Sequence, residues 1–348
     1  MNRSRATFLP SPGDPYVLLH CLSFFQNVWQ SEVDKLYIHI NSDIEFPVVV
    51  ATIELLKKLN DKIVVIYSDH ITNHGTALDT MLSQCNEENI MLIEDDTAIF
   101  KKGIVDKYFN LLETDQYEVV GSPRGSCSQN WAEIAKNKFN LDYSGFGDRG
   151  GNFWPCFLWA KKSVLLETDR NFNAKTFEAG ENFLGTTLTE LACGDTFTWT
   201  SMQLRLAGRR ILEIPQYHCN PADKKFYKPR KLGIFDGKCG YMHFGSLSSG
   251  ISGYLIDRNN KHLKDRLKPH AQPEVRDVIK DMDKGELETR LAFWKESYRI
   301  GTELGFYVQG FSEAYKDSLD YLQERGGITD ADIYQWVQLY KHEVMGAI

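Results

Sequence analysis

Residues 89–97 read Asn-Ile-Met-Leu-Ile-Glu-Asp-Asp-Thr, so an apolar run ends in three consecutive carboxylates. The run Ile90–Ile93 is typical of a strand that is buried on both faces of a parallel sheet. Three adjacent negative charges repel one another and resist burial unless a cation lies beside them. Mg²⁺ or Mn²⁺ is the expected cation, because hard oxygen ligands suit these ions and they bring phosphates with them. The alternative is a solvated acidic turn that follows a core strand.

The composition is that of a soluble globular protein, with 348 residues of which 42% are hydrophobic and 25% charged. No apolar run reaches the roughly 18 residues of a membrane helix, and the first residues contain no apolar signal core. The seven cysteines are scattered and form no CxxC pair, which favours reduced thiols and a cytoplasmic protein. The net charge of −7 argues against a protein that coats nucleic acid non-specifically.

Strand-like and helix-like segments alternate over the first 120 residues. We predict strands at Tyr16–Phe25, Lys35–Ile40, Lys62–Tyr67 and Ile90–Ile93, and helices at Pro47–Leu59 and Thr76–Cys85. This alternation predicts right-handed βαβ units and therefore an α/β fold with a mostly parallel sheet. Ligands bind at the carboxyl ends of the strands in such sheets. Polar residues gather at those ends, namely Asp43, Asp69, Asn73 and the triplet Glu94-Asp95-Asp96.

The remainder of the chain changes in character. Residues 121–220 are rich in glycine and aromatic residues, and Leu191–Arg210 predicts a turn that leads into a helix with Gly208 as its C-cap. Ile211–Ile214 then predicts a strand. From about residue 257 the sequence is charged and helix-like to its end.

The order of these features resembles the GT-A-fold glycosyltransferases, the class that uses nucleotide-sugar donors, over roughly residues 16–250. The triplet Glu94-Asp95-Asp96 stands as the Glu-Asp-Asp variant of that family's DxD motif. The resemblance implies a Rossmann-type catalytic domain over 1–256, with a nucleotide-sugar half at about 1–120 and an acceptor half at about 121–256. A helical region, 257–348, follows it. The resemblance also implies that Asp96 ligates Mn²⁺ or Mg²⁺, while Glu94 and Asp95 face the ribose or sugar of a donor such as a UDP-sugar.

Two upstream features also match the family. Asn73-His74-Gly75 resembles the Asn-x-Gly element that opens the helix before the metal strand, and a helix N-terminus can face an anion. Asp43 stands where family members place an Asp against the nucleotide base, and Asp69 ends the neighbouring strand as a further donor-site candidate. The structural alternatives are a tight turn at Gly75 and a turn-forming Asp43.

Two downstream features complete the resemblance. Gly194-Asp195, followed by Arg205-Leu-Ala-Gly208, resembles a block whose acidic residue often acts as general base in inverting members. The family often shows Glu-Asp there, so only Asp195 carries over, and a helix N-cap is its structural alternative. His243 resembles the late His that completes the metal or diphosphate site, and a neutral imidazole suits manganese. Its alternative is a structural histidine.

Aromatic and basic residues suggest how an acceptor is bound. Trp154 is a candidate for stacking on a sugar face, although at least one of Trp154 and Trp159 is expected in the core, and Trp131 is a candidate for the acceptor cleft. The basic run 224–231 interleaves Lys224, Lys225 and Lys228 with aromatic residues, a pattern that suits nucleic acid.

These residues leave several acceptors and activities open. One candidate acceptor is a hydroxymethylated or already glycosylated base in DNA, as in bacteriophage-type DNA modification, and the other is a free or lipid-linked saccharide. A non-catalytic nucleotide-sugar-binding protein is a further alternative. A nucleotidyltransferase is disfavoured, because no Gly-rich phosphate loop with Arg and Lys follows the first predicted strand.

Overall fold

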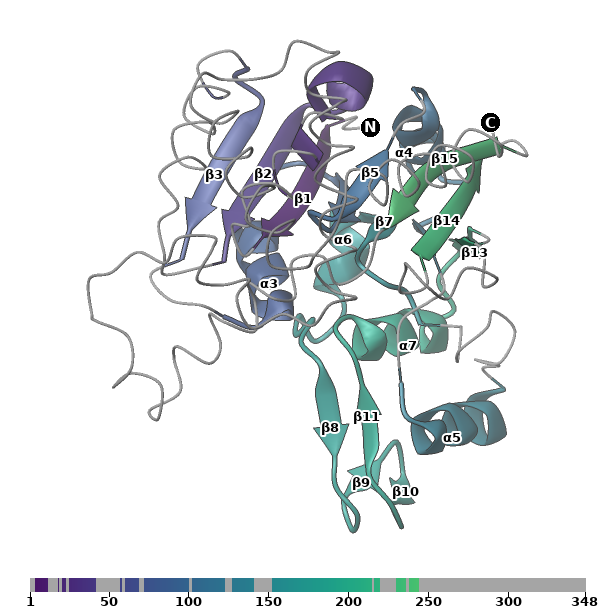
Figure 1. The fold of residues 1–348 in the computed structure, drawn as a ribbon. Helices are drawn as coiled ribbons and strands as arrows, with labels where there is room; N and C mark the ends of the chain where they lie inside the picture. The colour runs from purple at the N-terminus through teal and green to yellow at the C-terminus, as the bar shows by residue number, and fades with distance from the viewer. Residues whose placement is uncertain are drawn as a thin grey trace, which may run out of the picture.

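The structure, a computed structural model, describes residues 4–11, 18, 21–22, 25–41, 57, 60–68, 72–99, 102–122, 127–140, 152–214, 216–219, 230–235 and 238–243. Within these ranges the chain folds around one mostly parallel sheet with helices on both faces (Figure 1). The predicted α/β class is therefore confirmed. Among the residues described, no helix combines the length and apolar character that a membrane crossing requires.

Seven strands form the main sheet of the described chain, in the order β12-β6-β7-β4-β1-β2-β3. Their bounds are β1 Arg5–Ser11, β2 Lys35–Ile40, β3 Ile63–Tyr67, β4 Asn89–Ile93, β6 Val119–Gly121, β7 Phe157–Lys161 and β12 Ile211–Glu213. Strands β1, β2, β3 and β4 run parallel, and β7 runs antiparallel between β4 and β6. The carboxyl ends of four neighbouring strands consequently meet at one edge.

The first strand is not where the sequence predicts it. Tyr16–Phe25 was expected to be a strand, but Cys21 and Leu22 are helical and a π-helix, η1, spans Phe25–Trp29. The first strand is β1, at the centre of the sheet between β2 and β4. An apolar run of this length suits a buried helix as well as a strand, which explains the error.

The other early predictions match observed elements closely. Strands β2, β3 and β4 coincide with the predicted segments to within one residue, and helix α3 (His74–Gln84) begins two residues before the predicted helix. The predicted helix Pro47–Leu59 falls almost entirely outside the described residues. Helix α7 (Thr198–Leu206) ends as predicted, with Gly208 just beyond it at φ 67°, in the left-handed conformation that favours glycine.

Alternating side chains of the strands fill the space on both sheet faces. Leu92 of β4 and Leu158 of β7 pack with Leu78 and Met81 of α3 in the main core. On the opposite face, Trp159 of β7 packs against aromatic residues of helix α4 (Ile104–Glu113). A short helix, α6 (Lys162–Leu166), follows β7 directly.

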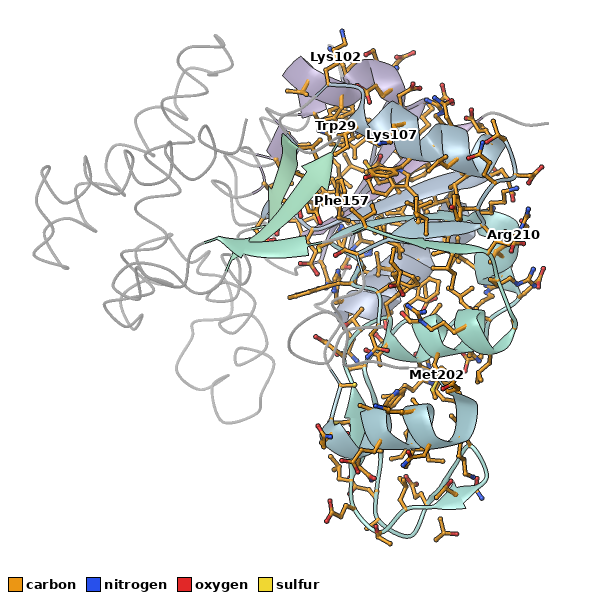
Figure 2. The ribbon with its side chains drawn as sticks, turned by 90° about the vertical axis from the view of Figure 1, so that its right-hand side faces the viewer. Trp29, Lys102, Lys107, Phe157, Met202 and Arg210 are labelled. Atoms are coloured by element: carbon orange, nitrogen blue, oxygen red, sulfur yellow. The ribbon has the colours of Figure 1, made fainter. Side chains whose placement is uncertain are left out.

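A second sheet lies across the end of β4. It has the order β13-β14-β15-β5, with bounds β5 Thr97–Ile99, β13 Gln216–Cys219, β14 Arg230–Phe235 and β15 Lys238–His243. Strand β5 follows the acidic triplet immediately, so the triplet forms the turn between the two sheets. The ring of Tyr241 in β15 stacks on Phe157 of β7, with centroids 3.5 Å apart (Phe157 is labelled in Figure 2).

A projecting arm forms the lower part of the molecule in Figure 1. It contains β8 (Lys175–Phe177) paired with β11 (Ala192–Gly194), the short hairpin of β9 (Asn182–Phe183) and β10 (Thr186–Thr187), and helix α5 (Gln129–Phe139). Its small core contains Trp131 and Phe183, together with Met202 of α7, which Figure 2 shows between the two helices. Trp131 is fully buried in this core, so its predicted place in an acceptor cleft is wrong.

Candidate active site

The acidic triplet lies at the carboxyl end of β4 and is not a solvated turn. Asp95 and Asp96 are each only 3% exposed, and the side chain of Glu94 is 18% exposed. The backbone N–H of Thr97 donates to the carbonyl of Glu94 at 3.0 Å, which closes the turn into β5. Burial of consecutive carboxylates is costly unless donors or cations compensate it. The solvated-turn alternative is therefore wrong.

Asp95 is held by the end of the neighbouring strand. The hydroxyl of Ser11, the last residue of β1, donates to Asp95 Oδ2 at 2.6 Å. The buried thiol of Cys21 interacts electrostatically with both Asp95 and Asp96. Burial, together with the negative charges of Asp95 and Asp96, raises the pKa of Cys21 well above its usual range, so this thiol stays protonated and neutral.

The carboxylate of Glu94 has two neighbours from different parts of the fold, a hydrogen-bond donor and a histidine. The indole N–H of Trp154 donates to Glu94 Oε1 at 2.9 Å, and His74 Nδ1 lies 3.9 Å from the same oxygen. His74 is the first residue of α3, whereas Trp154 precedes β7. Trp154 was expected to stack on a sugar face, but its polar edge is engaged with the triplet. The accompanying expectation that at least one of Trp154 and Trp159 lies in the core is confirmed, because Trp159 is fully buried.

The start of α3 is fixed by close packing. A Cβ on Gly75 would lie 2.2 Å from the backbone nitrogen of Asn173, so only glycine fits there. The side chain of Asn173 accepts a hydrogen bond from the Thr76 backbone N–H at 2.9 Å. Asn73 is the exposed N-cap residue, and its side chain makes no capping hydrogen bond. The helix N-terminus that the sequence suggested as an anion site therefore already has one of its amides occupied by Asn173, a contact that no sequence motif signalled.

The register of the second sheet brings His243 to the triplet. Strand β15 pairs antiparallel with β5, and His243 is opposite Thr97, the residue that follows Asp96. Two segments 146 positions apart, from Thr97 to His243, thus meet at the edge of the main sheet. The ligand role of His243 stays a prediction.

The donor set fits a hard divalent cation that is shared with a ligand. Asp95 and Asp96 supply carboxylate oxygens at one turn, and the backbone register of β15 places residue His243 opposite Thr97, which follows that turn. Within the described ranges, no group of three or more His, Cys, Asp and Glu side chains forms a ready-made metal cage. Mg²⁺ and similar ions in phosphate-transfer sites are usually held by one or two carboxylates plus substrate phosphates, so a complete protein cage is not required.

Asp195 lies at the end of β11, with its side chain exposed. Its Oδ1 accepts the Thr196 N–H at 2.7 Å, and its backbone carbonyl accepts the Thr198 N–H at 3.0 Å. The N-cap of α7 is Phe197, so the N-cap alternative for Asp195 is wrong. Its role as a base stays a prediction.

Arg205, the other member of that sequence block, contacts residues of the protein core and of β12. It forms an ion pair with Glu213, and its guanidinium lies 5.2 Å from the centre of the Phe153 ring.

Several predicted site residues lie outside the described part of the chain. These are Asp43, Asp69, Lys224, Lys225 and Lys228, and the region 257–348 lies outside it too.

The structure adds one buried titratable residue that the sequence did not single out. His39, near the end of β2, is 3% exposed, and burial lowers its pKa to about 4. Its Nε2 lies 3.4 Å from the Ser68 hydroxyl.

Comparison with known proteins adds no argument about the activity of this chain. No family model matches the sequence, and no curated protein matches it. One solved structure that matches is a mannosyltransferase from Pyrobaculum calidifontis in complex with GDP-Man and Mn²⁺. The match covers 99% of this chain and 85% of that chain, with 8% identity and a TM-score of 0.41. A likeness of this size carries no argument about activity.

Proposed function

We propose that this chain is a metal-dependent glycosyltransferase that moves a sugar from a nucleoside-diphosphate sugar to a hydroxyl acceptor. The observation that carries the proposal is the burial of Asp95 and Asp96 at the carboxyl edge of a mostly parallel sheet, with His243 in register beside them. Ligands of open α/β sheets bind at this edge. Carboxylates that are buried there are suited to a cation that also binds phosphate.

Each residue has a definite task in this proposal. Asp96, with His243, holds the Mn²⁺ or Mg²⁺ ion. A bound divalent ion would neutralise the charge that develops on the departing nucleoside diphosphate. Glu94 and Asp95 orient the ribose or the sugar, and the Ser11 hydroxyl fixes the direction of Asp95. Asp43, Asp69 and Asn73 complete the donor site.

Asp195 would take the proton of the acceptor hydroxyl if the reaction inverts the anomeric carbon. That role needs a carboxylate that is reachable from solvent and acceptor, and the exposure of Asp195 is compatible with it. The proposal specifies the acceptor only as a hydroxyl group. The DNA interpretation depends on Lys224, Lys225 and Lys228, which lie outside the described residues.

The proposal is tested by ligand-dependent thermal stabilisation. UDP and GDP are each added to the wild type with and without Mn²⁺, and we expect one of them to raise the melting temperature only when the metal is present. Asp96→Ala should abolish this shift. Asp61→Ala is the control, because Asp61 is an exposed acid on the turn before β3, at the opposite end of the strands. An unchanged shift in Asp96→Ala would contradict the assignment.

A donor panel then identifies the sugar. Release of the nucleoside diphosphate is measured for UDP-sugars and GDP-sugars with saccharide acceptors and with DNA. Metal-dependent release from one donor supports the activity, whereas metal-dependent binding with no release from any donor favours a non-catalytic binding protein.

A further inference from the structure

We propose that Trp154 is a positioning residue that holds Glu94 through its indole N–H, and that it does not stack on a sugar. This inference rests on the proposed function, because it assigns a duty within the same donor site. The observation behind it is the 2.9 Å hydrogen bond from Trp154 Nε1 to Glu94 Oε1. A hydrogen bond to a charged acceptor is stronger than one between neutral groups and fixes the direction of the carboxylate.

The segment that carries Trp154 is anchored at three closely spaced residues. The Phe153 N–H donates to the hydroxyl of Ser201 in α7 at 2.9 Å, and the Trp154 N–H donates to the Ser122 carbonyl at 3.2 Å. Two residues later, the Cys156 carbonyl accepts the hydroxyl of Thr97 at 3.2 Å. Because the backbone is tied to α7, to the end of β6 and to the turn after the triplet, the indole is presented to Glu94 from a rigid support.

The opposite side of Glu94 is equally constrained. His74 Nδ1, 3.9 Å from the same carboxylate oxygen, is carried by the first turn of α3. Gly75 and Thr76 lock that turn against Asn173. Glu94 therefore lies between α3 and the segment before β7, with both neighbours held in place by their own contacts.

The connection crosses the two halves of the chain. Glu94 belongs to the part that contains β1 to β4, and Trp154 belongs to the part that contains α7, Asp195 and the projecting arm. The indole thus links the direction of a donor-site carboxylate to a segment that is anchored on α7 and on the end of β6.

The first test uses the same substitution at two tryptophans. Trp154→Phe removes the N–H that binds Glu94, whereas Trp159→Phe removes a buried indole N–H that has no hydrogen-bond partner in the described structure. We expect Trp154→Phe to weaken Mn²⁺-dependent nucleoside diphosphate binding, or to raise donor KM, by about tenfold or more with a smaller effect on kcat. Trp159→Phe should leave both unchanged, although it removes more core packing. Equal binding in the two variants would overturn the role of Trp154.

The second test asks whether Trp154 acts through Glu94. In a double-mutant cycle, Trp154→Phe should have almost no further effect on binding in the Glu94→Ala background, because the acceptor of its hydrogen bond is gone. Additive effects would show that the indole acts in another way, such as stacking on a sugar, and would overturn the proposal.

The third test needs no ligand and separates this inference from the proposed function. The indole N–H resonance of Trp154, identified by its loss in Trp154→Phe, should shift strongly in Glu94→Ala, and the resonance of Trp159 should not. An unmoved Trp154 resonance would overturn the contact itself. Failure of the wild type to bind any nucleoside diphosphate with Mn²⁺ would instead contradict the proposed function, whatever the resonance does.

Discussion

The two ends of strand β1 meet carboxylates in opposite ways. At the amino end, the guanidinium of Arg5 binds both oxygens of Glu113, at 2.7 and 3.0 Å, and one oxygen of Asp106 at 2.6 Å. At the carboxyl end, the hydroxyl of Ser11 binds one oxygen of the buried Asp95. The guanidinium of Arg5 is at the centre of the first cluster. The second cluster is the triplet, where the described contacts include the Ser11 hydroxyl on Asp95 and the Trp154 indole and His74 imidazole beside Glu94.

The difference between the two ends separates a structural cluster from the proposed donor site. Burial alone lowers the pKa of Arg5, but the hydrogen bonds that its guanidinium donates to Glu113 and Asp106 raise it overall, so the cation is permanently charged and ties β1 to α4. The triplet at the other end forms a turn at the edge where four strands end. The chain itself closes the Arg5 cluster, whereas in the proposed function a bound metal ion and nucleotide-sugar donor complete the triplet.

Changing one carboxylate to an amide in each cluster should have opposite effects. Asp96→Asn should reduce metal-dependent nucleotide binding by about a thousandfold, roughly 4 kcal/mol, because the ion loses a charged ligand. Its melting temperature should stay constant or rise, because repulsion within the triplet decreases. Glu113→Gln should lower the melting temperature and leave binding intact. Titration calorimetry with Mn²⁺ and nucleoside diphosphate, beside thermal unfolding, checks both, and a stability loss alone in Asp96→Asn would assign the triplet to structure.

Removing the cation tests the structural cluster directly. Arg5→Met should cost about 3 kcal/mol of unfolding free energy, because Glu113 would be left as a buried charge without its partner. Arg210→Met is the matched control. Arg210 lies at the surface (Figure 2), its side chain is 54% exposed and its pairing with Glu118 is long, so the cost should stay below about 1 kcal/mol. Urea unfolding of the two variants measures the difference, and equal costs would mean that the Arg5 cluster has no special structural role.

Sequence patterns predicted the carboxyl edge of the main sheet better than they predicted all the strands that end there. The apolar runs of β2, β3 and β4 end in polar residues, and this pattern was sufficient to locate the triplet. The central strand β1 was missed because its residues, Arg-Ala-Thr-Phe-Leu-Pro-Ser, include few large apolar side chains and a proline. Its burial comes from its neighbours β2 and β4, and local sequence does not contain that information.

Long-range pairings also limit how much of the candidate site can be predicted from the sequence. The meeting of His243 with Thr97 depends on a β15–β5 register that no local pattern encodes, so only the resemblance suggested it. The indole contact from Trp154 to Glu94 was missed for the same reason. An aromatic residue in an apolar segment predicts burial, but not which carboxylate its polar edge will find.

The unfolding free energy of the protein should depend on pH through His39, which lies near the carboxyl end of β2. Burial lowers the pKa of His39 from about 6.5 to about 4, so between these values the unfolded chain binds a proton that the folded protein does not. His39 alone should therefore lower stability by about 2 kcal/mol between pH 7 and pH 5. Asp79 acts in the opposite direction, because burial raises its pKa to about 6 and protonation below that value relieves the cost of its charge.

Two variants separate these contributions. His39→Gln should remove the loss, so that stability no longer falls between pH 7 and pH 5, whereas Asp79→Asn should make the fall steeper. Urea unfolding at the two pH values gives the change in free energy. A His39→Gln variant with the wild-type pH dependence would show that His39 titrates normally in the folded protein.

The smallest predicted change in stability concerns two neutral side chains, Asn89 and Asn152, near the two ends of β4. Asn89, the first residue of β4, is buried and donates to the Ser4 carbonyl at 3.4 Å. Asn152 precedes β7 near the other end of β4 and is fully buried, yet neither atom of its amide has a hydrogen-bond partner within the described structure. Replacing an unsatisfied buried amide with an apolar group of similar size removes a desolvation cost. Asn152→Leu should therefore raise unfolding free energy by about 1 kcal/mol, and Asn89→Leu should lower it. If both changes lower it, the carboxyl edge is satisfied as fully as the amino edge, and the asymmetry is confined to the charged residues.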